Sequence, residues 1–164
     1  MKSRIKYIKG DVTNPVGEGR KVIAHCVNNI NVMGAGVAKA IYTKWPIVKE
    51  AYHHSFELVE PVLGEAIFIK VEEDVTVSNI FGQDGVGLDI DGFPPVRYWA
   101  LEQGLNTTGH HCTAHIDAWN KYHTKTSLHT VCIGCGLAGG SWSVVEQILL
   151  RSIPQEIEIY VYDL

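Results

Sequence analysis

Apolar and polar residues alternate in several short stretches of the chain, and elsewhere apolar residues recur every three or four positions. Alternation and short apolar runs predict strands, whereas the longer period predicts helices. The expected strands cover residues 4–9, 22–26, 65–71, 75–81, 127–133 and 156–162. The expected helices begin after residue 36, cover residues 47–59 and 97–122, and begin again near Trp142. Gly104 and Gly109 could divide the third helix. This order of elements is typical of an α/β domain, and the short turn at residues 72–74 predicts one antiparallel strand pair.

The stretch from residue 22 to residue 41 carries the clearest signal. A short apolar strand leads into a polar segment with His25 and Asn28, then reaches Gly34-Ala35-Gly36, and a helix follows at once. The first turn of a helix has N–H groups without internal partners, and glycines before it let a ligand approach the backbone closely. We therefore expect an anion such as a phosphate group to bind here. The alternative is that the glycines only turn the chain from strand to helix.

A second combination of strand, glycine loop and helix occurs near the end of the chain, where residues 134–140 precede the helix near Trp142. If the two strands run parallel and side by side, both loops meet at one edge of the sheet, and their N–H groups could bind two adjacent phosphates. The sequence GCGLAG at residues 134–139 also matches the dinucleotide fingerprint GxGxxG, which would indicate a nicotinamide-dependent oxidoreductase. Only one strand follows it, which is too few for a dinucleotide-binding domain.

Two further regions carry residues with useful chemistry. Asp11 stands at the end of the first strand, where a carboxylate either caps a turn or accepts hydrogen bonds from a ligand. Residues 82–95 are rich in Gly, Asp and Pro, which predicts a functional loop or lid. Its chemically useful members are Gln83, Asp84, Asp89 and Asp91.

The histidines and cysteines do not predict a metal site. His111 and His115 lie four apart on an expected helix, but no third ligand accompanies them, so we interpret them as surface histidines. We expect Cys132 inside a strand and Cys135 inside a glycine loop, whereas a redox-active CxxC pair opens a helix. We therefore expect neither a bound metal nor a redox role.

Composition and charge narrow the class of partner. The chain has 164 residues, 46% of them apolar and 20% charged, which predicts one globular domain over residues 1–164. Its net charge is −4 and its fourteen Lys and Arg are scattered, which argues against binding duplex nucleic acid. The sequence has no apolar run long enough to span a bilayer and no apolar signal core at the N-terminus. We expect a cytoplasmic monomer without a membrane partner or cofactor.

An ordered series of short motifs resembles the macrodomain, the ADP-ribose-binding fold. The motifs are GDVT at residues 10–13, AHCVN at 24–28, GAGVAKAI at 34–41, NIFGQ at 79–83, PPVRYWAL at 94–101, IGCGLAGGSW at 133–142 and VYDL at 161–164. The resemblance covers nearly the whole chain. It implies a three-layer α/β/α sandwich around a central mixed β-sheet.

The resemblance also implies roles at matching positions. Asp11 would accept a hydrogen bond from the adenine amino group, Val12 would offer its backbone, and Asn28 would hold the distal ribose. The two glycine loops would bind the diphosphate. The implied ligand-binding residues are Asp11, Val12, Asn28, Gly34, Ala35, Gly36, Val37, Gln83, Gly134, Cys135, Gly136, Leu137, Ala138 and Gly139, and the implied catalytic residues are His25 and Asn28.

The most similar branch of that family contains ADP-ribose-1''-phosphate phosphatases and protein ADP-ribose hydrolases. A hydrolase of this branch that acts through a lysine carries it where this chain has Gln83, and carries an aspartate where this chain has Ala138, so we do not expect that mechanism. His25 matches the phosphatase-like members, and we expect it to titrate near neutrality as an acid or base. In a phosphatase, Asp84, Asp89 or Asp91 could orient this histidine or the water. A structural histidine at a strand end is the alternative.

Two hypotheses follow for the function. The first is an enzyme that hydrolyses ADP-ribose 1''-phosphate or a related ADP-ribose ester. The second is a catalytically silent module that binds ADP-ribose. On either hypothesis the expected partner is ADP-ribose, a derivative of it, or an ADP-ribosylated protein.

Overall fold

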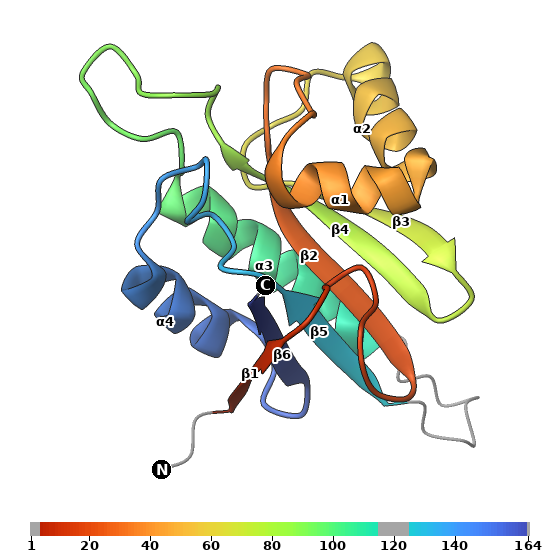
Figure 1. Cartoon of the computed structure of the whole chain (residues 1–164). Helices are drawn as coiled ribbons and strands as arrows, with labels where there is room; N and C mark the ends of the chain where they lie inside the picture. The colour runs from red at the N-terminus through yellow and green to blue at the C-terminus, as the bar shows by residue number, and fades with distance from the viewer. Residues whose placement is uncertain (1–3, 115–124, 164) are drawn as a thin grey trace.

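A computed structural model describes residues 4–114 and 125–163 of the chain. Its centre is one six-stranded sheet with four helices around it (Figure 1). The strands are β1 (Ile5–Lys9), β2 (Arg20–Asn28), β3 (Ala66–Glu72), β4 (Val75–Gln83), β5 (Thr126–Thr130) and β6 (Glu158–Asp163). The helices are α1 (Gly36–Lys44), α2 (Pro46–Leu58), α3 (Tyr98–Ala114) and α4 (Trp142–Ser152).

The strand order of the sheet is β1-β6-β5-β2-β4-β3. All neighbouring strands run parallel except β3 and β4, which form the expected antiparallel pair. β2 lies between β5 and β4, with Val22 opposite Leu128 on one side and Thr76 on the other. The sheet is therefore mixed, and the two strands that lead into the glycine loops are parallel neighbours, which is the condition under which both loops meet at one edge.

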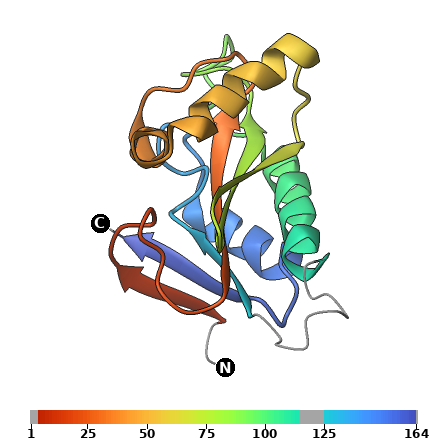
Figure 2. The same ribbon diagram turned by 90° about the vertical axis from the view of Figure 1, so that its right-hand side faces the viewer.

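Helices cover both faces of the sheet, which confirms the expected three-layer sandwich (Figure 2). On one face, Val22 and Leu128 pack in a core with residues of α3 and α4, including Leu101 and Leu149. On the other face, a second core joins sheet residues to α1 and α2. Because successive side chains of a strand point to opposite faces, β2 supplies both cores, with Val22 and Ala24 in the first and Ile23 in the second.

The glycines of α3 do not divide the helix, so that prediction is wrong. α3 runs without interruption from Tyr98 to Ala114, and the rest of the expected helix, with His115, lies outside the described residues. A Cβ on Gly104 would lie 2.2 Å from Cγ2 of Ile80, and a Cβ on Gly109 would lie 2.9 Å from the carbonyl oxygen of Ser152. These glycines let α3 pack closely against β4 and the end of α4.

β5 is shorter than its apolar sequence predicts, because it ends at Thr130 rather than Ile133. The Ile133 N–H donates to the Val131 carbonyl at 2.6 Å, so the chain turns and Ile133 enters the core beside α3 and α4. Cys132 is exposed in this turn, which contradicts its expected place in the strand.

Within residues 4–114 and 125–163, no helix is long and apolar enough to cross a membrane. Among the same residues, no three or more His, Cys, Asp or Glu side chains gather where they could hold a metal ion.

Candidate functional site

A cavity of about 410 Å³ lies at the carboxyl ends of β2 and β5, between the two glycine loops. We call it the first cavity. Its walls come from β2, residues 32–38, residues 131–134 and 136–138, the end of β4 and the loop after β4. Ligands of open α/β sheets bind at this edge, outside the carboxyl ends of the strands.

The two glycine loops meet at this cavity. A Cβ built on Gly36 would lie 3.9 Å from Cδ1 of Leu137, so the loops are in van der Waals reach of each other. α1 begins at Gly36, and its N-cap, Ala35, has no side chain that could cap the first turn. The first-turn N–H groups of α1 are therefore available to an anion at the cavity wall.

The second loop also keeps free donors. It is closed internally by a hydrogen bond from the Gly140 N–H to the Gly134 carbonyl at 2.7 Å. Within the described residues, the N–H groups of Gly136, Leu137 and Ala138 donate to no other group. Successive unpaired N–H groups form the kind of concave nest that binds anions.

A second, wider cavity continues beyond Gly36, which lines both cavities. Asp11 and residues of α1 form its walls. Asp11 Oδ1 accepts hydrogen bonds from the Thr13 N–H at 2.8 Å and the Thr13 hydroxyl at 2.7 Å, and these bonds lower the pKa of the carboxyl group. Asp11 thus caps a turn and still borders a cavity, so the two interpretations of this residue are compatible.

His25 is fully buried in β2 at the wall of the first cavity. Its Nε2 is hydrogen-bonded to Oδ1 of Asn79, the residue opposite it on the neighbouring strand β4. Because a side-chain carbonyl oxygen only accepts, Nε2 carries the proton and the neutral ring keeps Nδ1 as an acceptor. Nδ1 has no partner among the described residues. Loss of solvent on burial lowers the pKa of His25 to about 4, which contradicts the expectation that it titrates near neutrality.

Asn28, at the end of β2, organises the loop that leads to the first glycines. Its Nδ2 donates to the Val32 carbonyl at 2.6 Å, and its Oδ1 accepts from the Ile30 N–H at 3.0 Å. The Tyr52 hydroxyl of α2 also donates to Oδ1 at 2.7 Å. These bonds fix the approach to the first glycine loop. A contact of Asn28 with the distal ribose stays a prediction.

The acidic residues of the loop after β4 do not reach the histidine. Asp84 and Asp89 pair with Arg97 at 3.7 and 3.5 Å. None of the three acids expected to assist His25 lines the first cavity, whereas Val86 of the same loop does. A direct bond from one of these acids to His25 is therefore contradicted, and Arg97 holds two of them near the start of α3. That one of them orients a water molecule stays a prediction.

The expected site residues fall into three groups. The first cavity is lined by His25, Asn28, Gly34, Ala35, Gly36, Val37, Gln83, Gly134, Gly136, Leu137 and Ala138. Asp11 and Gly36 line the second cavity. Val12 is buried in the core, and Val12, Cys135 and Gly139 line neither cavity.

Several lining residues were not expected from the sequence. Val32 and Met33 come just before Gly34, the first residue of the first glycine loop. This position was the signal in the sequence that could have identified them as lining residues. The second cavity also takes in Lys39, Thr43 and Lys44 of α1. Lys39 and Thr43 lie four apart, so the helical period places them on one face of α1. This spacing was the signal in the sequence that could have grouped them in one site with Asp11.

Solved structures of other proteins share this fold. No family model matches the chain. A solved structure of a protein of unknown function from Bacteroides thetaiotaomicron is 41% identical, covers 98% of both chains and superposes with a TM-score of 0.89. A macrodomain protein from Streptomyces coelicolor is 32% identical over 98% of this chain and 99% of its own, with a TM-score of 0.78. The chain belongs to the macrodomain family.

One curated relative of this macrodomain carries an activity in its name. A DNA ADP-ribosyl transferase and DNA ADP-ribosyl glycohydrolase fusion protein of Thermosipho africanus is 26% identical over 151 residues. The match takes in 83% of this chain but only 36% of the length of that relative. The Thermosipho africanus DarTG protein has been solved in complex with ADP-ribose, and at 20% identity and a TM-score of 0.70 this likeness shows the fold alone.

Proposed function

We propose that this macrodomain binds ADP-ribose, with the adenosine in the second cavity, the diphosphate against the glycine loops and the distal ribose in the first cavity. The observation that carries the proposal is that Gly36 lines both cavities, next to two sets of unpaired backbone N–H groups. A dinucleotide-like ligand has two ends joined by a diphosphate, and two cavities that share Gly36 in their walls suit that shape. The ADP-ribose bound by the Thermosipho relative supports the choice of ligand.

The charge pattern of the first cavity fits backbone recognition of the diphosphate. Its lining contains no Lys, Arg, Asp or Glu among the described residues. Phosphate binding by N–H groups at the start of a helix needs no cation. The absence of carboxylates leaves the negative diphosphate without a repelling neighbour in this wall.

Hydrolysis of ADP-ribose 1''-phosphate to ADP-ribose and phosphate is the second candidate function. The loop N–H groups favour it, because such donors stabilise charge that develops on a phosphoryl group. The side chains at the cavity wall favour the binding module instead. Gln83 and Ala138 cannot form a lysine adduct or supply an acid, and His25 with a pKa of about 4 is not a proton donor at pH 7.

Calorimetric titration with ADP-ribose, ADP and AMP tests the binding proposal. We expect one site, with ADP-ribose binding about tenfold more tightly than ADP because the distal ribose adds contacts in the first cavity. Equal affinities for ADP-ribose and AMP would contradict the two-cavity arrangement. Phosphate release from ADP-ribose 1''-phosphate, followed beside release of ADP-ribose from modified protein, decides between the enzyme and the binding module.

Asp11→Asn tests the adenine end of the site. Both bonds from Thr13 fall on Oδ1, and an asparagine oxygen can keep them while its amino group replaces the second oxygen. If Oδ2 of Asp11 accepts a hydrogen bond from adenine, the difference in binding free energy between ADP-ribose and its inosine analogue should shrink by roughly 1.5–3 kcal/mol in the variant. Equal discrimination by the variant and the wild type would show that Asp11 does not read the base.

A further inference from the structure

Two cysteines occupy the ends of a tight turn beside the first cavity. The Cys135 N–H donates to the Cys132 carbonyl oxygen at 3.1 Å, which closes a four-residue β-turn over residues 132–135. Gly134, the third residue of this turn, has φ +73, the conformation that a type II turn needs there. The Cα atoms at the ends of a β-turn lie less than about 7 Å apart, and a disulfide spans about 4.4–6.8 Å. The backbone thus holds the two cysteines at a separation that a disulfide can bridge.

The position of Cys132 differs from the one on which we based the expectation of no redox role. Cys132 is exposed in the turn that follows β5, and it lines the first cavity. All four cysteines of the chain are free. A small oxidant can therefore reach the Cys132 sulfur, and a second thiol follows three residues later.

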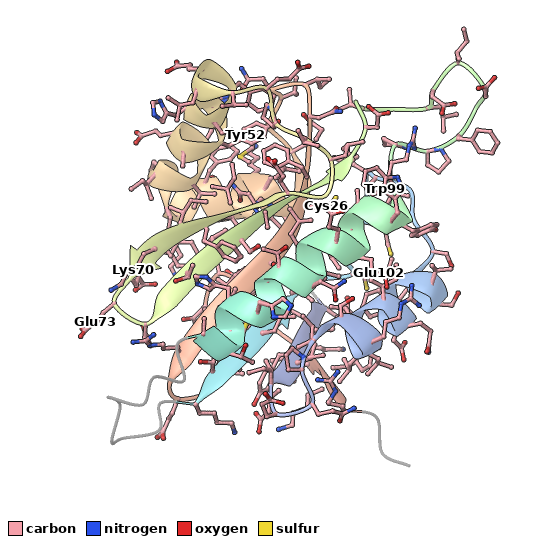
Figure 3. All side chains as sticks on the ribbon, turned by 180° about the vertical axis from the view of Figure 1, so that it is seen from behind. Cys26, Tyr52, Lys70, Glu73, Trp99 and Glu102 are labelled. Carbon is pink, nitrogen blue, oxygen red and sulfur yellow. The ribbon has the colours of Figure 1, made fainter. Side chains whose placement is uncertain are left out.

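The other thiols are less accessible than that of Cys132. Cys26 of β2 packs against the core beside α3, and burial raises its pKa to about 12 (Figure 3). Cys112 is fully buried in α3, and burial raises its pKa to about 12 as well. Cys135 is half-buried, and burial, then the charge of Cys132, raises its pKa to about 11. Cys132 is therefore the thiol that reacts first with an oxidant from solvent.

Oxidation has to change the contacts of Cys135. Its thiol donates to the Ile133 carbonyl oxygen at 3.4 Å, and its side chain packs against the core. A disulfide sulfur carries no hydrogen, so the bond to Ile133 is lost when the disulfide forms. Residues 136–138 come next along the chain and carry the free N–H groups of the second loop. A rearrangement at Cys135 thus acts directly on the donors that face the diphosphate.

We propose that Cys132 and Cys135 form a reversible disulfide that weakens the hold of the second glycine loop on the diphosphate. The effect on binding rests on the proposed function, whereas the disulfide does not. The oxidant is a low-molecular-weight disulfide such as oxidised glutathione. The Cys132 thiolate attacks one of its sulfurs and releases one glutathione thiolate, and the Cys135 thiolate then attacks the Cys132 sulfur and releases the second. The protein thiols lose two electrons and two protons, and the oxidant becomes two thiols.

Mass spectrometry after incubation with oxidised glutathione tests whether the disulfide forms. Trypsin cleaves after Lys125 and Arg151, so the peptide of residues 126–151 carries Cys132 and Cys135 and no other cysteine. We expect this peptide to become two hydrogen atoms lighter and to regain them with dithiothreitol. A peptide that stays reduced or stops at the glutathione adduct would overturn the proposal, as would a cross-link from Cys135 to Cys26.

Three variants assign the roles of the thiols. Cys135→Ser removes the second thiol, so we expect a lasting glutathione adduct on Cys132. Cys132→Ser removes the exposed thiol, so we expect Cys135 to react at least about tenfold more slowly than the wild-type pair. Cys112→Ala is the matched control, because Cys112 lines neither cavity, and it should form the disulfide at the wild-type rate. Oxidation of Cys132→Ser at the wild-type rate would contradict the role of Cys132.

Calorimetric titration of ADP-ribose into the reduced and the oxidised protein tests the effect on binding. We expect oxidation of the wild type and of Cys112→Ala to weaken binding about tenfold. Because the two equilibria are linked, saturating ADP-ribose should favour the reduced form by the same factor. That factor raises the reduction potential of the disulfide by about 30 mV for two electrons.

The titrations also separate this proposal from the proposed function. If neither the reduced nor the oxidised protein binds ADP-ribose, the proposed function fails and the effect on binding falls with it. The mass of the peptide of residues 126–151 still decides whether the disulfide forms. If both forms bind ADP-ribose equally well, the proposed function stands and the proposal of a disulfide that weakens binding is overturned.

Discussion

The two combinations of strand, glycine loop and helix look alike in sequence but use their glycines differently. The first unit is β2, the loop Gly34–Gly36 and α1, and the second is β5, the loop from Gly134 to Gly140 and α4. A Cβ on Gly34 would meet nothing within 4 Å. A Cβ on Gly139 would lie 2.5 Å from Cβ of Pro94, and the backbone there has φ +75. The first loop is thus open toward the site, whereas part of the second is fixed by the protein around it.

A buried histidine in each strand shows the same contrast. His129 of β5 is bonded at both ring nitrogens, to the Tyr162 hydroxyl at 2.7 Å and the Ser127 hydroxyl at 2.8 Å. His25 of β2 is bonded only at Nε2. Burial lowers the pKa of each to about 4. The histidine of the second unit is thus satisfied within the protein, while the histidine of the first keeps an unpaired acceptor at the wall of the cavity.

The largest expected effect is on the fold and comes from the second loop. Gly139→Ala places a methyl group against Pro94 in a backbone conformation that alanine disfavours, so we expect the free energy of unfolding to fall by about 3 kcal/mol. Urea denaturation measures it. The matched control is Gly136→Ala in the same loop, where a Cβ meets nothing within 4 Å and stability should change by less than about 0.5 kcal/mol. Equal stability of the two variants would show that the loop is not fixed by packing.

The next effect is a loss of stability at low pH that both units share. The pKa of His25 and of His129 lies near 4 in the folded chain, below the ordinary 6.5, so the unfolded chain binds more protons between these values. Their contribution is fully present above pH 6.5 and is lost as the pH falls toward 4. We expect each histidine to lower the free energy of unfolding by about 2 kcal/mol between pH 7 and pH 5. A stability that is flat over this range in urea titrations would contradict the burial of both rings.

A smaller effect separates the two histidines. His129→Asn loses two side-chain hydrogen bonds and His25→Asn only one, so we expect the first to lower the free energy of unfolding at pH 7 by about 1 kcal/mol more than the second.

If the protein hydrolyses ADP-ribose 1''-phosphate, turnover of His25→Asn should stay within about threefold of wild type, whereas loss of a general acid or base costs about 10²–10⁴-fold. A larger drop in turnover in a stable His25→Asn protein would restore His25 to the mechanism.

The local pattern of the chain was enough to predict the strands and helices of an α/β domain and one antiparallel strand pair, because these depend on strand and helix periods and on the order of elements. The three layers and the mixed sheet came from the resemblance to the macrodomain, and the meeting of the two glycine loops depended on their strands being parallel neighbours. The end of β5 was not predictable in this way. Val131 and Ile133 have apolar side chains that suit a strand, but the chain turns there and packs Ile133 in the core beside α3 and α4.

The chemistry of the site depends on contacts between distant residues, and the sequence alone does not show them. His25 owes its low pKa to burial in the sheet, and its partner Asn79 comes from another strand. The ion pairs of Arg97, just before α3, with two acids of the loop after β4 are another such contact, and they keep these acids away from His25.

The central claim, that both loops bind one ADP-ribose, is tested most directly by titrating ADP-ribose into wild type, Gly34→Val and Gly136→Val. A Cβ at either position meets nothing within 4 Å, so both variants should fold with wild-type stability while their side chains occupy the space of the diphosphate. The account predicts that each variant loses at least about tenfold in affinity, which corresponds to about 1.4 kcal/mol. An unchanged affinity for ADP-ribose in either folded variant would contradict it.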